Sequence, residues 1–356
     1  MTTTALPADP RGRRTWALVA LLAVGCVVAF VVSVWWGTGS IRISPVKAFE
    51  SWTDPDNASR LAQVAVEARS ARAVMAMAVG AALAIAGSFL QLLYRNPLAS
   101  PEITGVTQGS VVAVVVYLAY GSTSTDEAIW FLPLIGCAGG LGAGLLTWAI
   151  ARLGGRVDPL RMILIGVLLG GLLFSVVGIA ILTTDEFSQD LIQWTVGSIQ
   201  VATWDRVWIL LGALAIAAPL VLYAVPLANG LGLGDDIAQG VGLGVNTARA
   251  IVLLAAATVT AAAVSLVGGI GFVGLVAPHL VRSRTGSDLR RLLPASALAG
   301  ALLVAAADFA ARNVRPGDIA DFFGVGADVA PTTLPTGVYL ALIGAPFFVH
   351  MLRRLP

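Results

Sequence analysis

Long apolar stretches, separated by short polar or Gly/Pro-rich breaks, run through the chain from residue 15 to residue 352. A helix needs about 20 mostly apolar residues to cross the hydrocarbon layer of a membrane. The pattern therefore predicts an all-α integral membrane protein with about ten transmembrane helices, of which the eighth and tenth are short. The expected spans are residues 15–36, 71–93, 103–120, 128–150, 162–182, 204–225, 249–267, 269–282, 293–311 and 337–352.

Composition supports the same class. Hydrophobic residues make up 57% of the 356 positions and charged residues only 12%, against about 25% charged residues in a typical soluble domain. The spans leave no room for a sizeable soluble domain, so we expect a short tail, residues 1–14, and one membrane domain, residues 15–356. The first apolar run, 16–36, exceeds the usual 7 to 15 residue core of a secretory signal and is interpreted as a retained span.

The distribution of basic residues predicts the orientation, because Lys and Arg near span ends concentrate on the cytoplasmic side. With the N-terminus inside, fourteen basic residues fall in cytoplasmic segments and eight outside. An even number of spans then places both termini in the cytoplasm. The longest outer segments are residues 37–70 and 312–336, and residues 229–250 form a cytoplasmic segment.

Several kinds of chemistry are excluded. Two cysteines and two histidines, scattered along the chain, provide neither a disulfide framework nor a zinc site. The only lysine is Lys47, so a phosphate loop of the form G-x-x-x-x-G-K-[ST] cannot exist. The G-x-G-x-x-G pattern at 269–274 lies in an apolar segment rather than between a strand and a helix, and its glycines are expected to form a tight reversal. We therefore expect no enzyme activity, cofactor, metal or nucleic-acid partner, and any ATP must be bound by another chain.

The cytoplasmic segment 229–250 carries Ile237, Val241 and Val245 at helical spacing, with glycines alongside. A short helix that exposes an apolar face suits insertion into the groove of a partner protein. An ordinary loop between two spans is the alternative on these residues alone.

The stretch LQLLYRNPLASPEITG, residues 90–105, interrupts the apolar pattern twice, at 95–97 and again at 101–102. In a soluble core it would be a helix end followed by a loop. Within a membrane, irregular backbone is tolerated only where it is buried in protein or lines a watery cavity.

Five ordered stretches resemble the FecCD-type permeases of ATP-binding-cassette importers, which take up ferric siderophores, haem and cobalamin. They read GAALAIAGSFLQLLYRNPLASPEITG, GDDIAQGVGLGVN, GGIGFVGLVAPHLVR, LRRLLPASALAGALLVAAADFAAR and LPTGVYLALIGAPFFVHMLRR. The resemblance implies a ten-span subunit of the bacterial cell membrane that dimerises around a translocation pathway. It also implies two copies of an ATP-binding subunit beneath the membrane and a substrate-binding protein outside.

The resemblance assigns roles to three groups of residues. Coupling to the ATP-binding subunit is implied for Gly234, Asp235, Ala238, Gly242, Gly244 and Asn246. Docking of the binding protein is implied for Arg69, Arg72 and Arg312, and a place at the cytoplasmic mouth of the pathway for Arg95, Asn96, Pro97 and Pro101. Asp308 and Arg312 match an AD…AR ending and stand four apart, which lets them pair on a helix.

Two features depart from the family pattern. The usual R-L-P-R before the second span reads Arg69-Ser70-Ala71-Arg72, and the outer segment 312–336 is longer than usual.

The most favoured function is import of ferric siderophores by alternating access, driven by separate ATPase subunits. Import of haem or cobalamin is the alternative within the same family. An ion-coupled secondary transporter would need ionisable residues near the membrane midplane, and the expected spans lack them apart from positions near their ends. A membrane scaffold would not require the coupling segment. Whether the subunit pairs with itself or with a paralogue stays open.

Overall fold

The computed structural model describes residues 10–36, 44–54, 59–121, 125–153, 157–183, 188–200, 202–314 and 334–353. These residues are helical with short connections and contain no strand. The helices are α1 Pro10–Trp35, α2 Pro45–Thr53, α3 Arg60–Leu93, η1 Pro101–Thr104 (a single 3-10 turn), α4 Val106–Tyr120, α5 Thr125–Ala151, α6 Pro159–Thr183, α7 Ser188–Val196, α8 Trp204–Gly232, α9 Asp235–Gly240, α10 Val245–Val267, α11 Val273–Thr285, α12 Leu289–Asn313 and α14 Thr336–Leu352.

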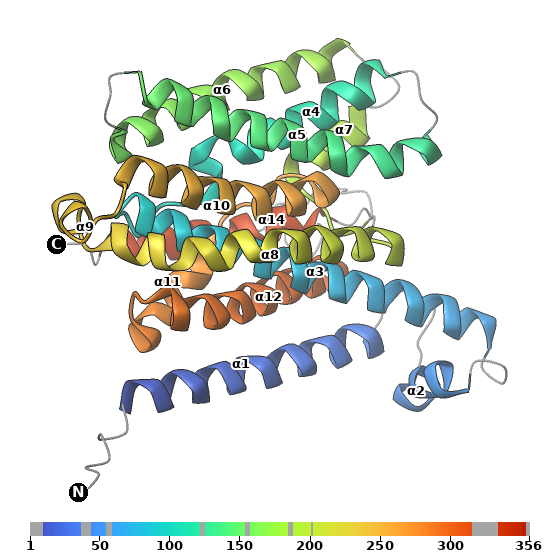
Figure 1. The fold of residues 1–356 in the computed structure, drawn as a ribbon. Helices are drawn as coiled ribbons and strands as arrows, with labels where there is room; N and C mark the ends of the chain where they lie inside the picture. The colour runs from blue at the N-terminus through green and yellow to red at the C-terminus, as the bar shows by residue number, and fades with distance from the viewer. Residues whose placement is uncertain are drawn as a thin grey trace, which may run out of the picture.

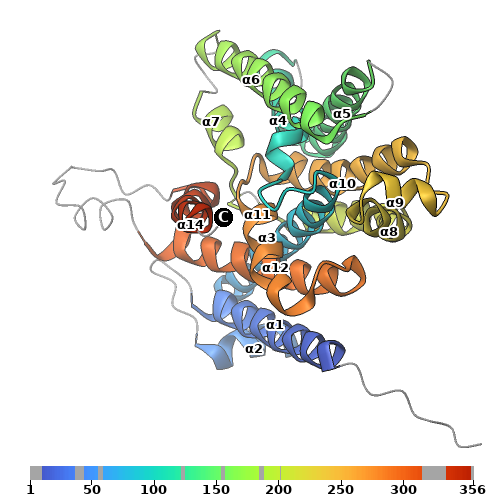
Figure 2. The same ribbon diagram turned by 90° about the vertical axis from the view of Figure 1, so that its left-hand side faces the viewer.

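The long helices run side by side in one bundle (Figure 1). α1 lies along one side of the bundle against α12, and α4, α5 and α6 form the opposite side (Figures 1 and 2). The start of α1, the short helix α9 and the end of α14 lie at the same end of the bundle, whereas α2 lies at the other end (Figure 1).

The centre of the bundle is formed by α3 and α10, the most buried of the long helices. Close approach of helix backbones at glycines makes this packing possible. A side chain at Gly80 on α3 would meet the backbone of Gly300 on α12, and one at Gly87 would meet the backbone of Gly274 on α11. Small residues serve this purpose because no hydrophobic force drives lipid-embedded helices together.

The outer helices expose apolar side chains over much of their surface. α1, α6 and α8 each bury less than a third of their most apolar stretch inside the bundle, and α6 alone exposes Leu164, Val167, Leu168, Leu172 and Phe174. Such a surface is stable in lipid rather than in water. The chain is a multi-pass membrane protein.

Each of the ten expected spans contains a helix, and seven of these helices are long and apolar enough to cross a membrane. The helices at the third, eighth and tenth expected spans, α4, α11 and α14, have 15, 13 and 17 residues. The fold class is therefore confirmed. The number of ten crossings and the cytoplasmic location of both termini stay predictions.

The helix bounds differ from the expected spans in two ways. The second span does not begin at 71: α3 starts at Arg60, so residues 60–70 of the expected outer segment continue the same helix. Two further helices, α2 and α7, are not among the expected spans; both are short and only weakly apolar. The outer segment 312–336 falls largely outside the described residues, which omit 315–333.

The reversal expected at the glycines of 269–274 is present between α10 and α11. Gly268 ends α10 with φ of 78°, and α11 begins at Val273. Positive φ is readily adopted by glycine because it has no Cβ. Gly268 directly precedes the pattern, whose first two glycines, Gly269 and Gly271, lie in the connection between the two helices.

Candidate functional site

The expected coupling segment forms a short helix between two long ones. α8 continues to Gly232 and α10 begins at Val245, so residues 229–232 and 245–250 belong to the flanking helices. Between them, α9 spans Asp235–Gly240. Val245 is therefore not on the same short helix as Ile237, contrary to the apolar spacing read from the sequence, because the chain turns at Gly242, where φ is 85°.

Ala238 fixes α9 to the bundle. Its side chain is fully buried, and its carbonyl oxygen accepts a hydrogen bond of 2.9 Å from the amide of Leu243. The opposite face of the segment is open: Leu233, Ile237 and Val241 are 64%, 56% and 74% exposed. We call these three residues the α9 surface. Exposed large apolar side chains grouped in this way are typical of a protein contact.

Asp235 connects α9 to two other helices through what we call the Asp235 cluster, made of Asp235, Arg95 and Arg249. Nη2 of Arg249 lies 2.8 Å and 2.9 Å from the two carboxylate oxygens of Asp235. Arg95 forms an ion pair with the same carboxylate. The Arg249 side chain is only 4% exposed, and a buried guanidinium requires such pairing because desolvating an unpaired charge is costly.

Backbone carbonyls extend the Asp235 cluster. Nε of Arg95 donates a hydrogen bond of 3.1 Å to the carbonyl oxygen of Leu231 on α8, and Nη1 of Arg249 donates to that of Val157 before α6. Asn246 also meets this connection, since its Oδ1 accepts a bond of 3.4 Å from the amide of Val157. The cluster thus joins the ends of α3 and α8, the start of α10 and the residues before α6 to α9.

The groove beside α9 has a volume of about 980 Å³. Its lining includes all three residues of the Asp235 cluster, together with Gly234, Gly244 and Asn246. The structure thus brings four of the expected coupling residues, Gly234, Asp235, Gly244 and Asn246, to one groove, and Ala238 is buried in the same short helix. Gly242 lies at the adjoining turn, and nothing lies within 4 Å of the place that a Cβ would take there.

The break after α3 has an ordered local structure. α3 ends at Leu93, Arg95 adopts φ of 49°, and Oδ1 of Asn96 accepts a hydrogen bond of 2.9 Å from the amide of Leu98. Pro97 is half-buried, and the buried Pro101 begins η1. The expected interruption is therefore present, and Arg95 joins it directly to the Asp235 cluster. Whether these residues line a pathway mouth stays a prediction.

The arginines expected to dock a binding protein lie at the far end of the bundle from α9. We call Asp308, Arg72 and Arg312 the Asp308 cluster. Nε of Arg72 donates 3.0 Å bonds to both carboxylate oxygens of Asp308, and Nε of Arg312 lies 3.2 Å from Oδ2. Asp308 is 1% exposed, Arg72 18% and Arg312 9%. The i,i+4 pairing of Asp308 with Arg312 is confirmed.

Further contacts tie the Asp308 cluster to α1 and α14. Nη1 of Arg312 donates to the carbonyl oxygen of Ser33 at 3.2 Å, and the hydroxyl of Thr336 donates to Asp308 at 3.1 Å. Arg69 is half-buried, and its Nη1 lies 3.4 Å from the carbonyl oxygen of Val34. The Asp308 cluster therefore holds four helices together, whatever contact its arginines make outside the chain.

Sequence reasoning missed the role of Arg249, which counted only as a cytoplasmic basic residue. Its partner Asp235 stands 14 residues earlier, beyond a turn, so no helical spacing links the two. Among the residues that the structure describes, no group of three His, Cys, Asp or Glu side chains could hold a metal ion.

Comparison with known proteins gives consistent results over nearly the whole chain. The model of the FecCD transport family matches residues 22–354. An iron(3+)-hydroxamate import system permease protein, FhuG of Bacillus subtilis (strain 168), is 34% identical over 92% of this chain and 94% of its own length. The vitamin B12 import system permease protein BtuC of Vibrio cholerae is 35% identical over 96% of this chain and 94% of its own.

A solved structure shares the fold. It is described as an inward-facing conformation of a metal-chelate type ABC transporter, and its chain superposes with a TM-score of 0.75 at 26% identity. The match covers 96% of this chain and all of that one.

Proposed function

Because the chain belongs to the FecCD transport family, we propose that it is the membrane permease subunit of an ATP-binding-cassette importer for ferric siderophores. Ferric chelates recur among the cargoes named for its relatives, including ferric hydroxamate, ferric citrate and siderophores. The vitamin B12 permease is as similar to this chain as these are, so cobalamin is the second candidate cargo.

The observation that carries the coupling role is the Asp235 cluster beneath the α9 surface. An ATP-binding subunit that contacts Leu233, Ile237 and Val241 would move α9 when it closes around ATP. Asp235 would transmit that movement to Arg95 at the end of α3 and to Arg249 at the start of α10. Charge-assisted bonds of this kind are the stronger hydrogen bonds in proteins, which suits a rigid connection.

The remaining partners follow the architecture of the family. Two copies of an ATP-binding subunit would bind the α9 ends of two permease subunits, identical or paralogous, and a substrate-binding protein would dock at the opposite end. The residues near Arg95, Asn96, Pro97 and Pro101 would then lie at the cytoplasmic mouth of the pathway.

The cargo is tested with the complete importer. The chain is co-purified with its ATP-binding subunit, reconstituted in proteoliposomes with the binding protein, and supplied with radiolabelled ferric siderophore, haem or cobalamin. We expect ATP-dependent uptake of the ferric siderophore and little uptake of the other two. Preferred uptake of cobalamin would replace the proposed cargo, and uptake driven by an ion gradient without ATP would exclude the importer class.

The same preparation tests which subunit hydrolyses ATP. We expect the purified chain alone to hydrolyse no ATP, because its only lysine, Lys47, is not part of a phosphate-loop motif. Hydrolysis should begin when the ATP-binding subunit is added. Turnover by the chain alone, with the ATP-binding subunit verifiably absent, would contradict this assignment.

A further inference from the structure

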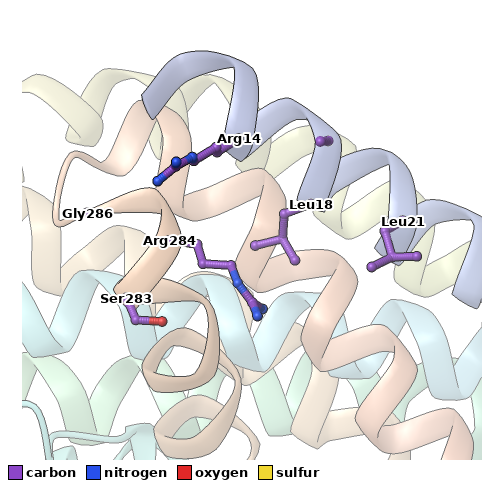
Figure 3. Close-up of a pocket in the computed structure, with 7 residues that line it drawn as sticks. Arg14, Leu18, Leu21, Ser283, Arg284 and Gly286 are labelled. Carbon is purple, nitrogen blue, oxygen red and sulfur yellow. The ribbon is translucent and has the colours of Figure 1, made fainter. Parts of the chain in front are cut away.

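A crevice of about 820 Å³ lies between the start of α1 and the end of α11, and it shares no lining residue with the α9 surface or the Asp308 cluster. Figure 3 shows Arg14, Leu18 and Leu21 on α1, with Arg284 extending from α11 below Leu18. The crevice is lined by Arg14, Ala17, Leu18, Leu21, Ser283, Arg284 and Gly286. None of these residues has a part in the transport function proposed above.

The lining changes from charged to apolar along α1. Arg14, Leu18 and Leu21 are spaced i, i+4 and i+7, so they share one face of the helix. Arg14 is also the first residue of the apolar stretch 14–35 that is long enough to cross a membrane. The guanidinium therefore lies at the edge of the hydrocarbon layer, and the two leucines continue into it.

Arg284 adds a second positive charge from the last turn of α11. In the part of the chain that the structure describes, no ion pair joins Arg14 or Arg284 to an acidic side chain. The acidic residue that follows in the loop, Asp288, is engaged elsewhere: it accepts a 2.7 Å bond from Nδ2 of Asn229 and caps α12 at Arg290. The positive charge at the crevice is thus not offset by this loop.

We propose that the crevice binds an anionic phospholipid from the surrounding membrane. Its phosphate binds the guanidinium groups of Arg14 and Arg284, which line the charged part of the crevice, and its acyl chains follow Leu18 and Leu21 along α1. Two arginines match a phosphodiester group well, because guanidinium groups form paired hydrogen bonds to phosphate oxygens. Basic pockets between transmembrane helices bind lipid head groups in this way.

The apolar half of the crevice distinguishes a lipid from a free anion. Inorganic phosphate would use only the arginines, whereas the leucine-lined half of the crevice, where Leu21 is 68% exposed, accommodates an acyl chain. A phospholipid satisfies both halves and is present at high concentration at this depth of the membrane. The proposal requires only that α1 crosses a membrane, so it does not depend on the cargo or on coupling to ATP.

The test uses the full chain in nanodiscs that contain phosphatidylglycerol and phosphatidylcholine in equal amounts, followed by native mass spectrometry of the released protein. We expect the wild type to retain phosphatidylglycerol preferentially. The double variant Arg14→Gln/Arg284→Gln should retain it roughly tenfold less, because each basic residue near an anionic lipid contributes several-fold to binding. Equal retention of the two lipids by the wild type would overturn the proposal.

Two further variants separate the crevice from general charge and from a simple anion site. The control Arg290→Gln/Arg353→Gln removes two exposed arginines that do not line the crevice, and it should retain the lipid as the wild type does. Ala17→Trp keeps both arginines but fills the crevice, and it should lose the lipid. Equal loss in the control, full retention by Ala17→Trp, or displacement of the lipid by inorganic phosphate would each overturn the proposal.

Discussion

The carboxylate of Asp308 accepts two hydrogen bonds of 3.0 Å from Nε of Arg72, a residue 236 positions earlier in the chain. Arg312 shares the same carboxylate. Of the three arginines that the family resemblance implies in docking, two are therefore paired with a buried carboxylate. Charge reversal of all three would place acidic groups against a buried carboxylate, so the fold and the docking surface must be tested with different substitutions.

Replacement of Asp308 should destabilise the fold. Asp308→Asn leaves Arg72 and Arg312 largely buried without a countercharge, and removal of one partner from a buried pair costs about 3–5 kcal/mol. Heat- or denaturant-induced unfolding of the purified protein in detergent measures the loss of stability. Glu67→Gln is the matched control, because Glu67 is exposed on the same helix as Arg72. Equal stability of the two variants would show that the cluster contributes little.

Disruption of the Asp235 cluster should uncouple import from ATP hydrolysis. Asp235→Asn removes the charge that holds Arg95 and Arg249, weakening hydrogen bonds to charged groups that contribute about 1.5–3 kcal/mol each. We expect normal expression, retained ATPase activity of the complex and several-fold slower import in proteoliposomes. Asp236→Asn makes the same change in charge at the exposed neighbour. If Asp236→Asn slows import as much as Asp235→Asn does, import depends on the net charge of α9 and not on the Asp235 cluster.

The turn at Gly242 separates the effect of side-chain bulk from that of backbone strain. Nothing lies within 4 Å of a Cβ added at this position, so the permease itself has room for one, but φ of 85° favours glycine. Asn tolerates this conformation better than most residues. Gly242→Asn should therefore keep coupled import, and Gly242→Trp should lose it if the partner seats closely on the turn. Transport assays of both variants with the same ATP-binding subunit provide the measurement; wild-type import by the Trp variant would place residue 242 outside the interface.

Arg69 is the arginine with which to test docking of the binding protein, since it lies outside the Asp308 ion pairs. Exposed ion pairs contribute about 0–1 kcal/mol and act mainly on association rates. Arg69→Gln should slow association about two- to fivefold and reduce its dependence on salt, with unchanged expression. Arg60→Gln, at the exposed start of the same helix, controls for general charge. Identical rates and salt slopes for wild type and Arg69→Gln would leave Arg69 with only its contacts inside the chain.

The apolar runs were sufficient to predict the membrane class and the approximate position of each long helix, because membrane insertion depends on local hydropathy. The same criterion failed where helices are charged or short. Arg60, Glu67 and Arg69 made the start of α3 look like an outer loop, although the helix continues through them. α7 was missed because its nine residues are mostly polar. Hydropathy identifies which segments enter the lipid. It does not show where a helix begins when its first turns lie outside the lipid.

The family motifs predicted a coupling role for residues of and around α9, and only the tertiary structure decided which side chains hold this helix in place. Asp235 meets Arg95 and Arg249 across separations of 140 and 14 residues. Arg72 meets Asp308 because α3 and α12 cross where Gly80 and Gly300 let their backbones touch. No periodicity in the sequence encodes such pairings, since they depend on the crossing of helices that are distant in the chain. The sequence by itself determined which segments are helices in a membrane, and the packing of those helices determined which charges neutralise one another.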